Sequence, residues 1–221
     1  MNHMTQATPK PLQQITYEII QRFETMAAAR DQAVTKGRQV IRLAANAVRA
    51  MHRDSFDQAE ALLNEASTLL AGIRETTVPF SGLYWAGYVQ DAMKEYAEAE
   101  LTRAMLRGEP LPAPQALGVE DGAYLNGMAE AASELRRDTL DALRTNEIER
   151  ALGLLENMDR VYGTLVTIDF PDAVTGGLRR TTDQLRAVLE RTRADVTVAV
   201  RQHRLEQALQ AAEKRWAGES S

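Results

Sequence analysis

The chain has 221 residues, which is enough for one extended domain or two small ones. Hydrophobic residues make up 44% and charged residues 26%, which excludes a largely disordered chain, and the absence of cysteine excludes disulfide scaffolds, thiolate metal sites and cysteine nucleophiles. The 26 basic and 31 acidic residues give a formal net charge of -5, so nucleic-acid binding would need a local basic surface. No stretch approaches the roughly 18 apolar residues of a membrane span, and we expect a cytoplasmic protein that does not enter a membrane.

Seven prolines divide the chain into long runs with helical periodicity. Ser55 and Gln58 have the spacing of a capping box at the start of one run, and Gly108, which has no Cβ, suits the end of another. The predicted helices span residues 12–53, 56–74, from after Pro79 to 107, 121–145, 147–166, and from after Pro171 to about 215.

No segment shows sustained strand alternation, and no repeat of 20 to 50 residues is present. The sequence therefore predicts an all-α protein, an antiparallel bundle of six to seven helices. We expect a single domain over residues 12–216, preceded by a disordered leader, 1–11, and followed by a disordered tail, 217–221.

Two predicted helices each carry a pair of carboxylates. Glu95 and Glu98 are three residues apart, and Glu130 and Glu134 are four apart, so each pair lies on one helix face. If the pairs face each other, the cluster requires protons or a cation. An all-oxygen ligand set favours Mg²⁺, with Mn²⁺ as the second choice, and such ions support phosphodiester hydrolysis. The alternative interpretation is a solvated acidic face, because glutamate is a common helix residue.

Four arginines on the first predicted helix form a second pattern. Arg38, Arg42, Arg49 and Arg53 follow one another at intervals of four, seven and four residues, which places them on one side of the helix. Such a stripe can contact successive phosphates of a nucleic-acid strand, although a plain solvated face has the same periodicity. The aromatic residues near the third helix favour packing over base stacking. They are Tyr84, Trp85, Tyr88 and Tyr96.

The residues around the carboxylate pairs resemble the translin family, and the match covers most of the chain in order. Its specific part comprises Glu95-Tyr96-Ala97-Glu98-Ala99, Leu117-Gly118-Val119, Tyr124-Leu125-Asn126-Gly127 and Glu134-Leu135. The first-helix part comprises Ile41-Arg42-Leu43, Ala50-Met51-His52-Arg53 and Phe56-Asp57-Gln58-Ala59, and the match from Ala151-Leu152 onward is looser.

The resemblance implies an all-α subunit of about seven helices that assembles into an octameric shell and binds single-stranded nucleic acid. Within this family the Trax branch carries acidic residues that make its complex a Mg²⁺-dependent endoribonuclease. Glu95, Glu98 and Glu134 match glutamates of that branch, whereas Glu130 stands where Trax has an aspartate. As a single chain, the sequence resembles prokaryotic translin-like proteins, for which a homo-oligomer with every active site is expected.

The sequence thus predicts a Mg²⁺-dependent endoribonuclease that acts on single-stranded RNA within a homo-oligomer, with an octamer expected. Glu95, Glu98, Glu130 and Glu134 are the predicted catalytic and metal-ligating residues, and the four arginines are the predicted RNA-binding residues. Two alternatives stay open. One is a non-catalytic oligomer that binds single-stranded RNA or DNA, and the other is a helical scaffold that binds no nucleic acid.

Overall fold

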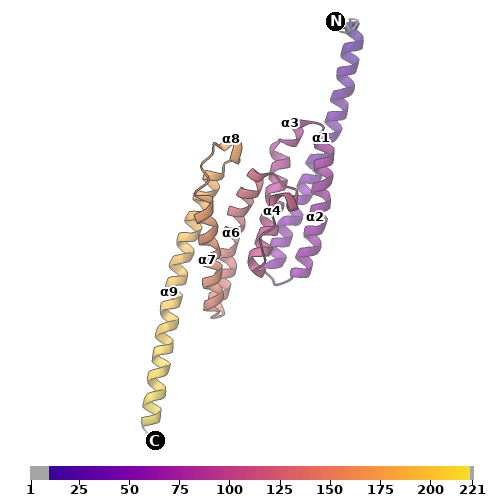
Figure 1. Cartoon of the computed structure of the whole chain (residues 1–221). Helices are drawn as coiled ribbons and strands as arrows, with labels where there is room; N and C mark the ends of the chain where they lie inside the picture. The colour runs from indigo at the N-terminus through magenta and orange to yellow at the C-terminus, as the bar shows by residue number, and fades with distance from the viewer. Residues whose placement is uncertain (1–9, 220–221) are drawn as a thin grey trace.

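The computed structural model describes residues 10–219 and forms one helical bundle (Figure 1). Within these residues, six long helices are joined by three helices of four residues each, and no strand occurs. The elements are α1 Leu12–Met51, α2 Phe56–Thr77, α3 Ser81–Tyr84, α4 Gly87–Arg107, α5 Pro114–Leu117, α6 Asp121–Arg144, α7 Ile148–Leu165, α8 Asp172–Thr175 and α9 Leu178–Glu219. The predicted all-α class is confirmed.

Most predicted helix boundaries agree with the structure, and the differences have local causes. Gly108 ends α4 with φ +66°, a left-handed conformation that glycine adopts without strain. The run after Pro79 is two helices rather than one, because the chain is extended at Ala86 between α3 and α4. The capping box is wrong: Ser55 precedes α2, but its side chain forms no capping hydrogen bond.

The ends of the chain bear on the predicted domain limits. The leader, 1–11, falls mostly on residues 1–9, which lie outside the described part, and α1 begins at Leu12. At the other end α9 continues beyond the expected residue 215 to Glu219, and residues 220–221 are again outside the described part. The single domain over 12–216 stays a prediction.

The core consists of small and apolar side chains at the helix contacts. α1 packs against α2 and α4, while α6 packs against α4, α7 and α9. Many contact positions are alanines, which let helix axes approach closely, and large side chains fill the remaining space. The large side chains with almost no exposed surface include Met51, Leu63, Leu70, Ile73, Met93, Leu101, Leu135, Met158, Leu165, Leu185 and Leu189.

Two helices extend beyond this core. The first part of α1 and the last part of α9 project from opposite ends of the bundle (Figure 1). None of the described helices has the long apolar stretch that crossing a bilayer requires. The cytoplasmic location stays a prediction.

Candidate functional site: an acidic cluster between α4 and α6

The four predicted glutamates come from two helices that pack directly against each other. Glu95 and Glu98 lie on α4, and Glu130 and Glu134 lie on α6. The helices approach closely at Gly127, where a Cβ atom would stand 2.7 Å from the carbonyl oxygen of Lys94 and 2.9 Å from the backbone nitrogen of Glu98. Only glycine fits this contact without a shift of one helix, and the contact sets the carboxylates of α6 against those of α4.

Three of the four carboxylates converge. Glu95, Glu98 and Glu130, hereafter the acidic trio, each place an oxygen so that all three lie within 4.8 Å of one another. All three residues are only partly exposed. The trio is therefore a concentration of negative charge that is partly withdrawn from water.

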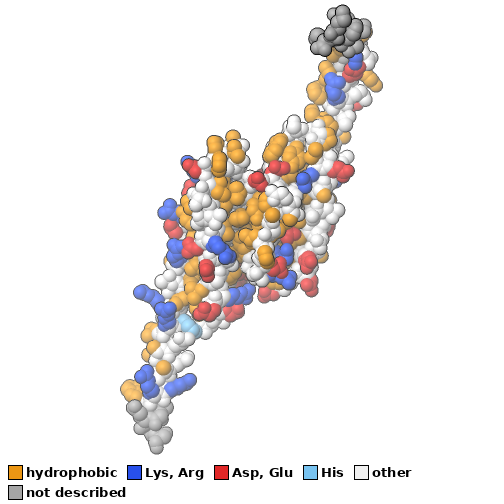
Figure 2. Space-filling view, viewed as in Figure 1, with side chains coloured by type: hydrophobic (Ala, Val, Ile, Leu, Met, Phe, Trp, Pro, Cys, Tyr) orange, Lys and Arg blue, Asp and Glu red, His pale blue; other side chains and the backbone are white. Residues whose placement is uncertain are grey.

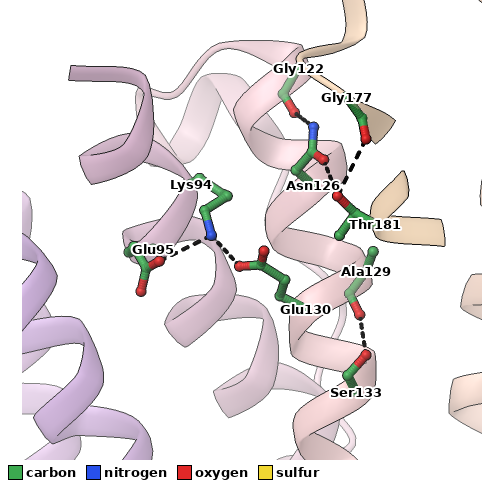
Figure 3. A network of polar contacts seen from close by, with 9 residues as sticks. All are labelled: Lys94, Glu95, Gly122, Asn126, Ala129, Glu130, Ser133, Gly177 and Thr181. Atoms are coloured by element: carbon green, nitrogen blue, oxygen red, sulfur yellow. Dashed lines mark hydrogen bonds and ion pairs between the residues drawn. The ribbon is translucent and has the colours of Figure 1, made fainter. Parts of the chain in front are cut away.

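Lys94 compensates part of this charge (Figure 3). Its Nζ lies 3.0 Å from Oε1 of Glu95 and donates a hydrogen bond to Oε2 of Glu130. Burial lowers the pKa of Lys94, but the contacts with Glu130 and Glu95 outweigh burial and raise the pKa, so the ammonium stays charged. Lys94 and Glu95 are adjacent in the sequence, but the spacing of residues along α4 does not indicate that the Lys94 side chain turns toward α6.

Glu98 is the most perturbed member of the trio. Burial raises the pKa of its carboxyl to about 9, and the charges of Glu130, Glu95 and Glu134 act in the same direction. At neutral pH this carboxyl therefore holds a proton. A cation that entered the cluster would replace that proton.

Glu134 lies at the edge of the trio and contacts a histidine. Nε2 of His52, at the end of α1, is 3.0 Å from Oε2 of Glu134, and its Nδ1 is 2.8 Å from Oδ2 of Asp138. The hydrogen bonds with Asp138 and Glu134 raise the pKa of His52 to about 9. At neutral pH the ring thus donates hydrogen bonds from both nitrogens, and it holds the Glu134 side chain of α6 against the end of α1.

His52 and Asp138 are site residues that the sequence pattern did not reveal. In the sequence analysis His52 appears only within the segment Ala50-Met51-His52-Arg53, and it is separated from its two partners by more than 80 residues. Helical periodicity identifies residues that share a face, but it does not show which faces of distant helices meet. The only sequence feature that singles out His52 is its position at the end of α1, where the chain turns.

A pocket of about 280 Å³ opens between α1, α4 and α6 on one side of the cluster. Of the four predicted arginines, Arg49 lines this pocket, while Arg38 and Arg42 are exposed elsewhere on α1. Arg53 is also exposed but lies in the turn after α1, because the helix ends at Met51 and not at the predicted residue 53. Arg137 of α6 also contributes, and it was not predicted. The lining residues are Ala44, Ala45, Val48, Arg49, His52, Glu95, Glu98, Glu134 and Arg137.

A larger pocket, of about 980 Å³, lies on the Lys94 and Glu130 side. Its wall includes Trp85, which is 60% exposed, whereas Tyr96 is buried and Tyr84 and Tyr88 are partly buried against the core. Packing was therefore the right interpretation for three of the four aromatics. Asn126 also lines this pocket and connects α6 with α8 by donating to the Thr175 carbonyl. It connects α6 with α9 by accepting a hydrogen bond from Thr181 (Figure 3).

The donor set of the cluster fits a hard divalent cation. Carboxylate oxygens are the ligands that Mg²⁺ and Mn²⁺ prefer, and the three oxygens of the trio already lie close together. The Lys94 ammonium already contacts two of these carboxylates, and burial together with the neighbouring negative charges raises the pKa of Glu98. We therefore identify Glu95, Glu98 and Glu130 as the residues that could hold such an ion, with Glu134 beside them.

Comparison with known proteins gives the same fold and a related sequence. The crystal structure of AfC3PO and a complex of AfC3PO with duplex RNA each superpose with a TM-score of 0.77 at 29% identity. The match covers 83% of this chain and 95% to 96% of AfC3PO. The apo form of NeC3PO has the same fold, with a TM-score of 0.74 at 20% identity over 87% of this chain and 100% of its own.

Sequence comparison also finds an uncharacterised protein of Methanocaldococcus jannaschii. It is 25% identical over 185 residues, which are 82% of this chain and 81% of that protein. No family model matches the sequence. Together with the structural matches, these similarities confirm the resemblance in the sequence: the chain has the fold of the C3PO structures and is similar to translin-like proteins.

Proposed function

We propose that this protein is a translin-like homo-oligomer that binds RNA and cleaves it with Mg²⁺ as an endoribonuclease. The convergence of Glu95, Glu98 and Glu130 from two helices is the observation that carries this proposal. On a solvated acidic face the carboxylates repel one another and turn into water, whereas these three place oxygens within 4.8 Å of one another, with the Lys94 ammonium beside them.

RNA as the substrate is supported by similarity and by charge. A structure of AfC3PO, at 29% identity, is a complex with duplex RNA. In this chain Arg49 connects the arginine stripe of α1 with the pocket beside the trio, so a phosphate held by the stripe lies near the carboxylates. We propose single-stranded RNA as the substrate, with little sequence preference, because arginines on phosphates do not distinguish bases.

Glu95, Glu98, Glu130 and Glu134 would hold the metal. When bound, Mg²⁺ supplies an activated water and stabilises negative charge on the phosphoryl group. His52 orients Glu134 through the 3.0 Å hydrogen bond. Arg49 and Arg137 line the same pocket and would bind phosphate oxygens of the strand.

The assembly is proposed to be an octamer in which the projecting helix ends contact other copies. Apolar side chains gather along the projecting part of α1 (Figure 2). Leu12 is 71% exposed, and Ile20 and Phe23 are also exposed, as are Leu205 and Leu209 on α9. A row of apolar side chains in water is costly, and contact with a second copy would bury it.

A cleavage assay tests the proposal. Labelled single-stranded RNA, and duplex RNA of the same sequence, are incubated with the protein in Mg²⁺ or in EDTA, beside an identically purified Glu95→Gln/Glu134→Gln variant. We expect cleavage of the single strand by the parent protein in Mg²⁺ only. Binding without cleavage in every lane would support the non-catalytic alternative, and no binding at any salt concentration would support the scaffold alternative.

A further inference from the structure

Lys94 has an unusual position for a lysine on a helix at the surface of a bundle. Its side chain is only 21% exposed and turns toward the carboxylates of Glu95 and Glu130 rather than into solvent (Figure 3). Immobilising a lysine in this way costs side-chain entropy, and an ordinary surface ion pair returns little. The position therefore indicates a role for the ammonium in the acidic trio itself.

Charge balance shows what that role would be. The three carboxylates of the trio carry three negative charges when all are ionised, while the neighbouring Glu134 shares the positive charge of His52 with Asp138. One divalent ion together with the Lys94 ammonium neutralises the trio completely. A second divalent ion beside Lys94 would leave two positive charges in a partly buried space, which is unfavourable at short distances.

The geometry of sites with two ions also indicates that this cluster holds one ion. Sites with two divalent ions hold them about 3.5–4 Å apart and share carboxylates between them. In this protein Glu95 and Glu130 are the two carboxylates that Lys94 already bridges. The ammonium thus takes the place between Glu95 and Glu130 that a second ion would need.

We propose that Lys94 serves as a built-in cation of the acidic trio, so that the site takes one divalent ion per chain, whereas the same carboxylates without the lysine take two. This inference rests on the proposed function, in which the trio holds a divalent metal. Lys94 is in this view a positioning residue that sets the number of ions.

Binding of Mn²⁺ alone to the full-length oligomer tests the inference without any nuclease assay. Electron paramagnetic resonance counts free and bound Mn²⁺ and detects the coupling between two neighbouring ions. The parent is compared with Lys94→Met, which keeps the stem and removes the charge, and with Lys94→Arg, which keeps the charge. Lys36→Met, on the side of α1 near Gly72, is the control for loss of a lysine elsewhere.

We expect one Mn²⁺ per chain in the parent, in Lys94→Arg and in Lys36→Met. In Lys94→Met we expect two coupled ions, the first bound about tenfold more tightly than in the parent, because a repelling charge is gone. Two ions in the parent, or one ion with unchanged affinity in Lys94→Met, would overturn the inference and leave the proposed function standing. A parent that binds no Mn²⁺ would overturn the metal site itself. If Lys94→Met does not fold, Lys94→Gln replaces it in the same comparison, and two ions in the parent would still overturn the inference.

Discussion

At the scale of single residues, Glu98 and His52 connect the protein's stability with pH. The pKa of each is raised to about 9, from 4.5 for the carboxyl and from 6.5 for the imidazole. A group with a raised pKa in the folded state contributes stability that is complete below its unfolded pKa and is lost as the pH rises through the folded value. Both groups therefore stabilise the metal-free protein in acid and lose that effect toward pH 9.

We predict that the urea midpoint of the metal-free protein falls between pH 6.5 and about 9. The urea midpoint of His52→Gln should fall less over the same pH range. At neutral pH the variant should be less stable than the parent by about 1–3 kcal/mol, because Glu134 and Asp138 lose a charged donor. Urea titrations followed by circular dichroism measure both effects. His203→Gln, whose partner is Gln207 on the exposed part of α9, is the matched control. If the urea midpoint of His52→Gln depended on pH as strongly as that of the parent, His52 would not be a cause of the pH dependence.

The arginine stripe gives a second prediction at this scale. Arg42→Ala together with Arg49→Ala should weaken RNA binding and reduce the steepness of its salt dependence by about one unit per lost phosphate contact. Fluorescence anisotropy with labelled RNA at several salt concentrations measures both quantities. The affinity for Mn²⁺ should not change, because neither arginine belongs to the trio. Arg150→Ala with Arg160→Ala on α7, also exposed, serves as the control. Equal RNA affinity in the two double variants would exclude the stripe as the binding surface.

At the scale of elements, the contact between α4 and α6 decides whether the glutamates form a site. Gly127 lies where the backbone of α4 comes close, next to Lys94 and Glu98. Gly127→Ala should destabilise the protein by about 1–3 kcal/mol through overpacking, in spite of the better helix propensity of alanine. It should also weaken Mn²⁺ binding, because the helices that carry the ligands move apart.

Gly153→Ala on α7 is the control for this prediction. A Cβ at Gly153 would meet no atom within 4 Å beyond its chain neighbours and the backbone of its own helix, so alanine should stabilise the protein there by about 0.5–1 kcal/mol. Thermal unfolding and Mn²⁺ titration of both variants provide the comparison. Equal stability of the two variants would show that the helices do not pack as closely at Gly127 as the structure has them.

Elements were also the level at which the sequence was most informative. Proline and glycine positions predicted where most helices begin and end, because both residues act on the local backbone. Spacing of three and four predicted that each carboxylate pair shares a face. It did not show that Lys94 turns toward Glu130 or that His52 contacts Glu134, because those contacts join helices that are distant in sequence and depend on the packing of the whole bundle.

At the scale of the whole molecule, the projecting part of α1 leaves a row of apolar side chains exposed. Ile20 and Phe23 are 51% and 59% exposed on a segment that extends from the bundle (Figure 1). We predict that Ile20→Asp with Phe23→Asp lowers the mass of the assembly while the helical content of the chain stays the same. Light scattering and circular dichroism measure these properties. Gln13→Asp with Gln21→Asp adds the same charge to polar positions of the segment and should leave the assembly intact. An unchanged mass in the first variant would remove α1 from the proposed interface.

The central claim is that the acidic trio is a metal-dependent cleavage site, and Glu98→Gln tests it most directly. Glutamine resembles the protonated carboxyl that Glu98 carries at neutral pH, so the variant should fold and bind RNA as the parent does. Glu100→Gln, on the same helix but paired with Arg103, is the matched control. The measurement is the rate of RNA cleavage in Mg²⁺ by the parent and the two variants. We predict a loss of at least about 100-fold in Glu98→Gln and a parental rate in Glu100→Gln. Cleavage at the parental rate by Glu98→Gln would contradict the claim.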